Sequence, residues 1–472
     1  MPGNEHSQLH ERVDKLRTRI VEGSILRAII ILAGPAVASR LLNVAYELID
    51  TIFLGHLGEA ELAAPTAAWP LLMLFMSIAI GISSSSVSMV SQLVGARDYE
   101  KASDVSSQLL GLTLLVGVLS AFLYAGISPV IYSAQSLSPE VYKLALIYTL
   151  YLAIGVPTFF AVIYYTNLLN SLGDTRTPFI LNTVSVTINI VLDPLLIFGL
   201  LGFPRWGVMG AAVATSIARI VAGIYALYHL SSGRIGFRVT PRIPTLPVTR
   251  VALKVGLPVS FQMSLTSIGF LVMIKIVALL GTAVLASYNV AVRILGLIQA
   301  FAFGFSQALG VVVGQNIGAG HTSRAWESAK KGLLLLFGLM GIGSLLIYLG
   351  NRPIVEVFTT SGDVIRESII MINIIAVGTP FLGVMFASNG IARGSGHTRI
   401  VALIGAARLW VFRIPLAYYL AFTVGLGPKG VWWAMTLSNI LSGLAAVAWV
   451  IRRSWLKGLT EEPIYAGQTQ NR

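Results

Sequence analysis

Three acidic side chains lie inside long apolar stretches of this sequence. Glu47 and Asp50 share one stretch, and Asp193 lies in another. A charge in the middle of a bilayer is costly, so an acidic residue there is expected to have a function or a buried basic partner. These three carboxyls are therefore the first candidates for binding an ion or exchanging a proton.

The two acids of the first stretch stand on a polar helix face. Asn43, Tyr46, Glu47 and Asp50 follow the spacing i, i+3, i+4 and i+7, which places them on one side of an α-helix. An amide, a phenol and two carboxyls would not face lipid. We therefore expect this face to point toward a cavity or a neighbouring helix.

The second stretch repeats this arrangement. Asn182, Ser185, Asn189 and Asp193 share a helix face, and Thr215 offers a hydroxyl in the next apolar stretch. Carboxylate, amide and hydroxyl oxygens can hold a hard cation such as Na⁺, whereas a buried carboxyl can exchange a proton near neutral pH. The spacing alone is compatible with either Na⁺ or H⁺.

The composition indicates a membrane protein. Of the 472 residues, 55% are hydrophobic and only 11% are charged, which is too few charges to cover a soluble surface. The formal charge of +13 does not indicate a nucleic-acid partner, because the basic residues lie between apolar stretches. The sequence has no cysteine, which excludes disulfides and thiolate metal sites.

Apolar stretches long enough to cross a bilayer occur twelve times, so we predict an all-α membrane protein with twelve transmembrane helices. The predicted spans are Ile25–Leu54, Ala64–Val90, Ser106–Ile131, Val141–Leu169, Thr177–Leu200, Gly207–Leu230, Val251–Leu280, Ala283–Val313, Ala325–Leu349, Val364–Ile391, Arg399–Val424 and Gly430–Ile451.

Basic residues concentrate in the segments on one side of these spans. They cluster before the first span, between the sixth and seventh spans, and after the twelfth. The positive-inside rule makes that side cytoplasmic, together with both termini. We therefore expect a multi-pass protein of the plasma membrane, with a surface helix over Glu11 to Val21.

The second half of the chain repeats the first at a constant offset. Pro35 corresponds to Pro258 and Gln92 to Gln315, and glycine, alanine and threonine positions follow the same offset. Each repeat holds six spans, an even number, so both enter the membrane from the same face. We expect two six-helix lobes related by a pseudo-two-fold axis along the membrane normal.

These boundaries divide the chain into five parts. We assign 1–24 to a cytoplasmic N-terminal tail, 25–230 to the N-lobe and 231–250 to a cytoplasmic linker rich in proline and arginine. The C-lobe is 251–455, and 456–472 form a cytoplasmic tail.

The charged residues inside the spans do not follow the internal repeat. At the offset that takes Pro35 to Pro258, Asp50 corresponds to Met273, and Asp193 has no acidic counterpart. The basic residues inside C-lobe spans are Lys275, Arg293, Arg408 and Arg413. Long basic side chains can reach the membrane interface, and we expect the same of Arg40 and Arg219 near span ends. Ion coupling is therefore expected in the N-lobe.

Pro35 lies in the same span as Asp50 and precedes it in the chain. Proline inside a membrane helix produces a kink or a hinge. Two interpretations remain open. Ion binding near Asp50 changes the bend at Pro35, or the kink is static.

The motifs around the two acids resemble the multidrug and toxic compound extrusion (MATE) family. They read Tyr46-Glu-Leu-Ile-Asp50 and Asn189-Ile-Val-Leu-Asp193-Pro194, and Asn170-Ser-Leu-Gly173-Asp-Thr-Arg adds to them. The resemblance covers about residues 25–455. It implies twelve helices in two lobes around a V-shaped central cleft. It also implies antiport, with export of amphipathic organic cations in exchange for Na⁺ or H⁺.

The chain is most similar to the DinF-like branch, whose coupling acids lie in the N-lobe. That resemblance ties first-helix bending to Pro35 and a Na⁺ site to Asp50, Asn189, Asp193 and Thr215. The positions that match residues tied to cation binding also include Asn43 and Tyr46. Glu47 stands where the branch often has an uncharged residue, so it adds a further candidate for proton or cation coupling.

Other functions remain open. A flippase for a lipid-linked precursor fits the basic residues of the C-lobe, although twelve spans and the paired acids favour the exporter. The sequence has no metalloprotease, nucleotide-binding or serine-hydrolase motif, so we expect no enzyme and no cofactor beyond transported H⁺ or Na⁺. Two fused lobes are expected to work as a monomer.

Overall fold

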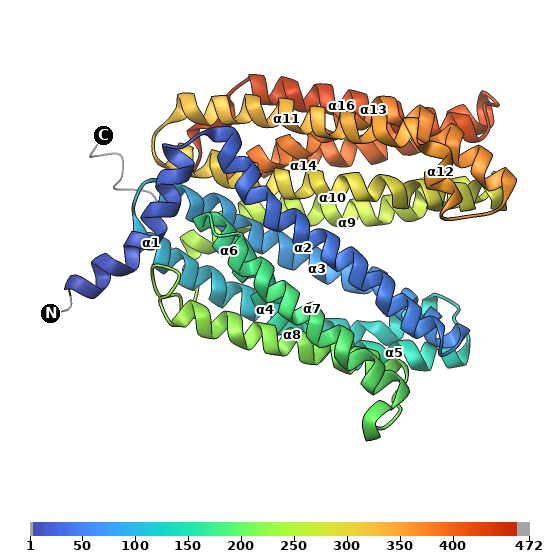
Figure 1. The fold of residues 1–472 in the computed structure, drawn as a ribbon, viewed down its shortest axis with the longest axis horizontal. Coiled ribbons are helices and arrows are strands. Elements are labelled where there is room, and N and C mark those ends of the chain that lie inside the picture. The colour runs from blue at the N-terminus through green and yellow to red at the C-terminus, as the bar shows by residue number, and fades with distance from the viewer. Residues whose placement is uncertain (1–2, 460–472) are drawn as a thin grey trace.

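The computed structural model describes residues 3–459, and every regular element in that range is a helix. A short N-terminal helix, α1 (Gly3–Val21), precedes two groups of long helices. Figure 1 shows that the two groups lie close together at the end that carries both described chain ends and diverge toward the other end. The predicted two-lobe, all-α membrane fold is confirmed.

The N-lobe contains α2–α8, and the C-lobe contains α9–α16. The N-lobe elements are α2 (Ile25–Gly55), α3 (Glu59–Gly95), α4 (Tyr99–Ala134), α5 (Pro139–Ile154), α6 (Val156–Leu172), α7 (Arg176–Phe198), η1 (Leu200–Gly202) and α8 (Val208–Ser231). The C-lobe elements are α9 (Leu246–Ala278), α10 (Thr282–Gly318), α11 (Thr322–Leu349), α12 (Asn351–Glu356), α13 (Gly362–Ser395), α14 (Thr398–Ala407), η2 (Arg408–Arg413), α15 (Ile414–Tyr418), η3 (Tyr419–Thr423), α16 (Pro428–Ile451) and η4 (Ser454–Lys457).

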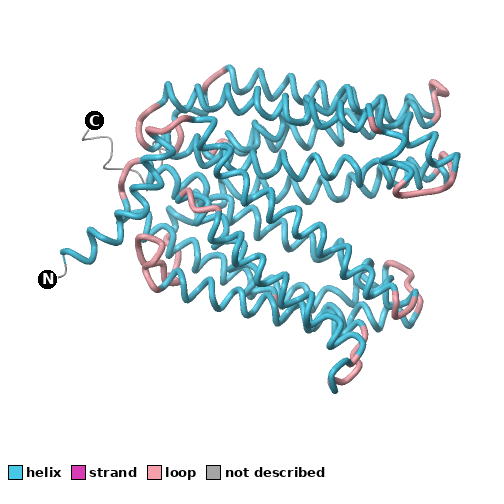
Figure 2. The backbone as a smooth tube through the Cα atoms, viewed as in Figure 1, coloured by secondary structure: helices cyan, strands magenta, loops and turns pink. Residues whose placement is uncertain are grey.

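These bounds place the connection between the lobes at 232–245, inside the predicted linker of 231–250. Figure 2 shows that the non-helical segments are short and lie at the two ends of the helix bundle. Of the predicted C-terminal tail, 460–472 lie outside the described residues.

Eleven helices of the described chain are long and apolar enough to span a membrane. The remaining predicted span, Val141–Leu169, is the pair α5 and α6, which are bent by 54° at a break. Gly155 and Pro157 stand at this break. The hydroxyl of Ser216 donates to the carbonyl of Tyr151 at 2.8 Å, which satisfies an acceptor beside the break.

The pseudo-two-fold relation appears in the contacts between the lobes. Gln92 Nε2 donates to the carbonyl of Gly394 at 2.9 Å, and Gln315 Nε2 donates to the carbonyl of Ser171 at 2.8 Å. The repeat offset takes the donor Gln92 to the donor Gln315, and it takes the acceptor Ser171 to the acceptor Gly394, because 315 − 92 and 394 − 171 are equal. The repeat is therefore a structural symmetry, and these bonds close the end where the termini lie.

Glycine allows the backbones to meet at this closed end. A Cβ on Gly318 would overlap the Gln92 carbonyl oxygen, so Gly318→Ala is expected to prevent full closure. Gly338→Ala is the control, because nothing lies within 4 Å of its Cβ position. Since the chain has no cysteine, spin labels at Glu100→Cys and Ser323→Cys can report the separation of the lobes. We expect longer distances in Gly318→Ala alone; unchanged distances would contradict a closed end that depends on this glycine.

Helix α1 lies across this end and touches both lobes. Arg17 Nε donates to the carbonyl of Gly95 at 2.9 Å, and Arg12 pairs with Asp174 at 2.7 Å, both in the N-lobe. Arg324 at the start of α11 donates to the carbonyl of Ile20 in α1 at 3.5 Å and to that of Gly23, which follows α1. The predicted surface helix is therefore present, and it bridges the two lobes.

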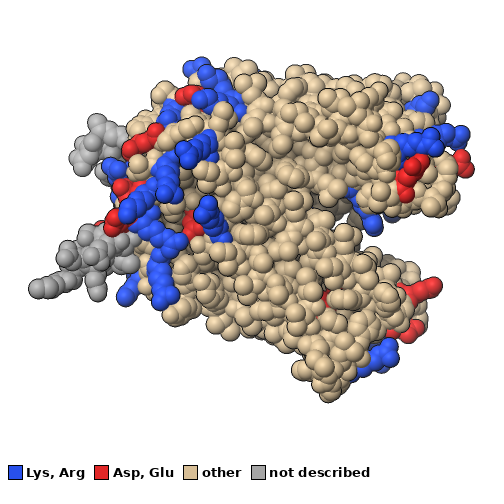
Figure 3. Space-filling model, viewed as in Figure 1, with Lys and Arg blue, Asp and Glu red and all other residues tan. Residues whose placement is uncertain are grey.

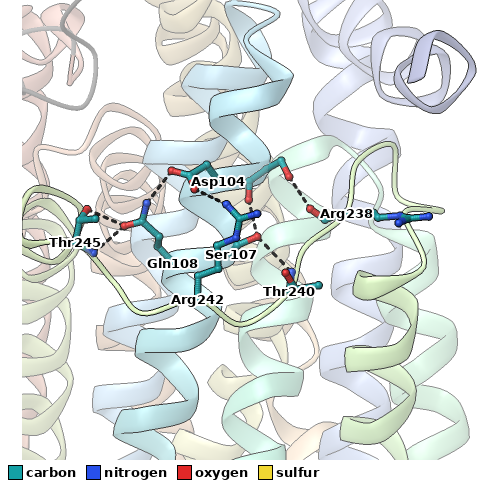
Figure 4. A network of polar contacts seen from close by, with 8 residues as sticks. Asp104, Ser107, Gln108, Arg238, Thr240, Arg242 and Thr245 are labelled. Carbon is teal, nitrogen blue, oxygen red and sulfur yellow. Dashed lines mark hydrogen bonds and ion pairs between the residues drawn. The ribbon is translucent and has the colours of Figure 1, made fainter. Parts of the chain in front are cut away.

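The connection between the lobes is fixed to the start of α4, as Figure 4 shows. Arg242 Nη1 donates to Asp104 Oδ1 at 2.9 Å. The backbone nitrogen and the hydroxyl of Thr245 both donate to Gln108 Oε1 at 2.8 Å, while Gln108 Nε2 donates to Asp104 at 2.7 Å. The segment 232–245 therefore belongs mechanically to the N-lobe, and the step into the C-lobe occurs at α9.

Charge is distributed unevenly over the visible surface. Figure 3 shows Lys and Arg side chains gathered at the end that carries the termini, whereas the opposite end carries a few residues of both signs. At that opposite end the surface is hollowed between the two lobes. The molecule is therefore closed at its basic end and open at the other.

Candidate functional site

The two predicted polar faces meet inside the N-lobe, where α2 packs on α7 and α7 packs on α8. Asn182 Nδ2 on α7 donates to Asn43 Oδ1 on α2 at 3.2 Å. One turn along α2, Tyr46 Oη lies 3.5 Å from Thr215 Oγ1 on α8. The structure therefore brings together the predicted polar faces of α2 and α7 and joins both to Thr215 on α8.

Asn189 is the centre of this cluster. One terminal atom of its amide lies 2.7 Å from Asp193 Oδ2 and 2.8 Å from Tyr46 Oη, and the other lies 3.2 Å from Thr215 Oγ1. A carboxylate oxygen only accepts hydrogen bonds, so the nitrogen must point toward Asp193 when that residue is ionised. Asn189 thus connects one acid to the tyrosine and threonine of the other two helices.

Two carboxylate oxygens in the cluster have no donor. Asp193 is fully buried, and Asp50 is half-buried one turn beyond Tyr46 on the same face of α2. Asp193 Oδ1 and Asp50 Oδ1 are both buried without a hydrogen-bond partner among the described residues. Leaving an acceptor buried and unpaired costs free energy, and a proton or a small cation would remove that cost. These two oxygens are the atoms that an ion would meet.

Arg219 is an intramembrane residue of α8 that the sequence prediction placed wrongly. It was expected near a span end, but α8 runs from Val208 to Ser231 and Arg219 lies in its middle, one turn after Thr215. Its guanidinium carbon lies 4.1 Å from the centroid of the Phe159 ring, and Nη1 has no partner within the described chain. The i, i+4 spacing to Thr215 was the available signal.

Arg219 changes the charge balance of the N-lobe interior. Asp50 and Asp193, when ionised, contribute two negative charges, and Arg219 contributes one positive charge. The cluster therefore has a net charge of about −1, which one monovalent cation neutralises. This balance suits H⁺ or Na⁺ better than a divalent ion.

The structure does not bring Glu47 into the cluster. Its side chain is exposed at the edge of the polar face, and it interacts electrostatically with Arg40, two turns earlier on α2. No hydrogen bond to its carboxylate occurs in the range 3–459. Glu47 therefore shares a helix with Asp50 but has different surroundings.

Glu47→Gln is expected to change gradient-driven transport by less than about threefold, because the Glu47 carboxylate makes no hydrogen bond to the cluster within residues 3–459. Efflux from proteoliposomes under a fixed ion gradient measures this. A loss comparable to that of a substitution at Asp50 would place Glu47 in the coupling site after all.

Pro35 lies where the first helix meets the other lobe. Helix α2 continues unbroken from Ile25 to Gly55 through this proline. Close by, a Cβ on Gly304 of α10 would lie 2.9 Å from the Val37 nitrogen, so the two helices pack backbone to backbone. A change of bend at Pro35 would therefore alter contact between the lobes, and its hinge role stays a prediction.

The sequence profile named MatE matches residues 35–195 and again residues 258–419. The chain belongs to the MatE family. The two matched segments begin at Pro35 and Pro258, which are the pair of prolines that the internal repeat superimposes. The predicted resemblance to the MATE family is thereby confirmed, so the chain belongs to a family of multidrug efflux transporters, and its assignment to the DinF-like branch stays a prediction.

Relatives and solved structures agree with this assignment. The chain is 26% identical to "Probable multidrug resistance protein NorM" of Thermotoga maritima, over 92% of this chain and 94% of that protein. It is 27% identical to "FAD transporter" of Shewanella oneidensis, over 91% and 95%. The crystal structure of MATE in complex with MaL6 matches with a TM-score of 0.87 at 24% identity, covering 93% of this chain and 99% of that one. The first relative is named for multidrug resistance and the second as a transporter, and the solved structure establishes the shared fold.

Proposed function

We propose that this MatE-family protein is an antiporter that exports amphipathic organic cations in exchange for H⁺ or Na⁺, coupled through the N-lobe cluster. The observation that carries the proposal is the pair of buried carboxylate oxygens without donors, Asp50 Oδ1 and Asp193 Oδ1. Asp193 lies beside Asn189, and Asp50 lies one helical turn from Tyr46, so the oxygens of Asn189, Thr215 and Tyr46 would complete a set of hard ligands.

The two candidate ions would use this cluster differently. H⁺ would bind one carboxyl and turn it into a hydrogen-bond donor, which would favour the opposite orientation of the Asn189 amide. Na⁺ would instead need several oxygens at once, from Asp50, Asn189, Asp193 and Thr215. Either ion would bring the net charge of the cluster to about zero and so lower the cost of burying it.

Transport follows from alternating access between the lobes. In the state described, the lobes are closed at the basic end and open at the other, so the cleft would exchange drug for the incoming ion. Ion binding between α2, α7 and α8 would change the packing of α2, which contacts α10 of the C-lobe near Pro35. Through that contact between α2 and α10, ion binding would affect the packing of the closed end. The closed end is the part of the molecule that must open for the cleft to face the inside.

The proposed orientation places the basic end and both termini in the cytoplasm and the open end outside. The concentration of Lys and Arg at the basic end supports it. We propose that the protein is located in the plasma membrane, acts as a monomer and needs no cofactor other than the transported ion. Its partners would be the bilayer and small organic molecules.

A flippase for a lipid-linked precursor is the second candidate. It is favoured by one observation, the arginines at positions 393, 408 and 413 that line a cavity of the C-lobe. The paired acids of the N-lobe favour antiport, because a flippase has no need of a cation site there.

The test is efflux of a fluorescent organic cation from proteoliposomes, driven by a Na⁺ gradient alone or by a pH gradient alone. Efflux under one of the two gradients would establish antiport and name the ion. Absence of gradient-driven efflux under both conditions, with the cation bound normally, would contradict the proposal and turn attention to lipid-linked substrates.

A further inference from the structure

The C-lobe contains a cavity of about 440 Å³ that the coupling cluster does not use. Its walls come from α9, α10, α11, α13, η2 and α16, and about half of the lining side chains are apolar, such as Met263, Phe270 and Met340. The charged residues that line it are Arg393, Arg408 and Arg413. The cavity is therefore apolar with a cationic region.

Two of these arginines share a single neutral acceptor. Arg413 Nη2 donates to Asn439 Oδ1 at 2.6 Å, and Arg408 Nη1 donates to the same oxygen at 3.0 Å. Arg413 Nε donates to the hydroxyl of Ser438 at 2.9 Å. The shared acceptor is the neutral amide of Asn439, not a carboxylate. The positive charges of the two guanidinium groups therefore lie close together and are not neutralised by this acceptor.

Some guanidinium nitrogens of the cavity arginines have no acceptor. Arg408 Nε and Arg393 Nε are both buried without a hydrogen-bond partner among residues 3–459. The acidic residues between 251 and 459 are all engaged elsewhere: Glu327 with Lys331, Glu356 with Arg352, Asp363 with Arg366 and Glu367 with Trp432. Within the described chain, no ion pair neutralises the arginines of the cavity.

The internal repeat shows that this cationic region corresponds to the coupling cluster. At the repeat offset, Thr215 corresponds to Ser438, and these side chains contact Asn189 and Arg413 respectively. The N-lobe segment is a regular α-helix, whereas Arg408–Arg413 form a π-helix, a feature often found at functional sites. The same contact between the fifth and sixth spans of a lobe therefore carries acids in one lobe and arginines in the other.

We infer that the C-lobe cavity binds the carboxylate or phosphate group of an amphipathic organic molecule, with the apolar body of that molecule against the methionine and phenylalanine side chains. Guanidinium groups match these planar or multivalent oxyanions in geometry as well as in charge. A volume of about 440 Å³ is within the range of small-molecule sites. The inference deepens the proposed function, on which it rests, by extending the cargo to molecules with an anionic group.

The binding test uses three fluorescent probes that differ only in charge: pyrenebutyrate, pyrenebutanol and pyrenebutylammonium. Energy transfer from tryptophan to pyrene, measured on the full-length protein in neutral nanodiscs, gives the three dissociation constants. We expect pyrenebutyrate to bind at least tenfold more tightly than pyrenebutanol. Equal binding of all three probes, or a preference for the cation, would overturn the inference.

Two variants locate the site. Arg408→Gln and Arg393→Gln are each expected to weaken pyrenebutyrate binding about tenfold and to leave pyrenebutanol binding unchanged. Arg366→Gln is the control, because its guanidinium is exposed and pairs with Asp363 at a helix end. Thermal unfolding of each variant shows whether it is folded. Folded variants that keep the wild-type affinity would place the anion elsewhere.

Competition distinguishes the source of the anionic group. Naphthyl phosphate added in water and phosphatidic acid incorporated in the nanodisc both offer a phosphate. Displacement of pyrenebutyrate by the soluble competitor indicates an aqueous cargo, and displacement by the lipid alone indicates a headgroup; both support the site. Displacement by neither would contradict it.

A variant of the coupling cluster separates this inference from the antiport proposal. Asp50→Asn should bind pyrenebutyrate with wild-type affinity even when its coupled efflux is lost. Persistent coupled efflux in that variant would refute the coupling role of Asp50 without affecting the anion site.

Discussion

Asp50→Asn is expected to lower gradient-driven efflux by roughly 100-fold, which corresponds to a loss of about 3 kcal/mol of coupling free energy. Asn has nearly the same shape but cannot ionise, so the cluster loses one of the two charges that an incoming cation neutralises. The buried Asp50 Oδ1 already lacks a donor, so the substitution removes no existing hydrogen bond from that atom. Efflux from proteoliposomes under the effective ion gradient measures the change.

The matched control is Glu47→Gln, the same type of substitution one turn away on the same helix. Glu47 lies at the edge of the polar face and makes no side-chain hydrogen bond to the cluster within residues 3–459, so its removal is expected to matter little. Thermal unfolding and binding of the fluorescent cation should be nearly unchanged in both variants. Wild-type efflux by Asp50→Asn would refute the coupling site proposed here.

Most of the fold could be predicted from the sequence because membrane spans and repeats leave regular signals. Apolar length predicted the spans, and a constant offset predicted the two lobes. The break between α5 and α6 was not predicted, because Gly155 and Pro157 also fit a continuous helix with a kink. Their counterparts at the same offset, Gly378 and Pro380, lie inside the unbroken α13.

The candidate site was predicted in part. Helical periodicity placed Asn43, Tyr46 and Asp50 on one face, and the structure turns that face toward α7 and α8. Helical periodicity assigns a residue to a face but does not locate the edge of that face. It therefore could not show that Glu47 lies at the edge, outside the cluster. The roles of these residues in coupling stay predictions.

The arginines show what a sequence pattern cannot give. Arg393 lies on α13, whereas Arg408 and Arg413 lie on the next span, and only packing brings the three to one cavity. The prediction allowed some basic residues of the C-lobe to reach the interface, which fits the exposed Lys275 and Arg293 but not the buried Arg413. Long-range convergence of like charges has no local signal.

Arg219→Gln is expected to strengthen binding of the coupling cation and to slow its release. Removing the positive charge changes the net charge of the cluster from about −1 to about −2, with both acids ionised. At an effective dielectric constant of about 20, a unit charge roughly 8 Å from the bound cation contributes about 2 kcal/mol, or roughly thirtyfold in affinity. We therefore expect the ion concentration for half-maximal efflux to fall by about that factor, and turnover to fall because release becomes limiting.

The control for this variant is Arg40→Gln, since Arg40 is an exposed arginine of α2 near Glu47 and outside the cluster. Isotope uptake or pH-jump measurements on both variants give ion affinity and release rate separately. Weaker ion binding in Arg219→Gln would mean that Arg219 organises the ligands rather than balancing their charge. The affinity change therefore distinguishes an electrostatic role from a structural one, because the two roles predict opposite signs.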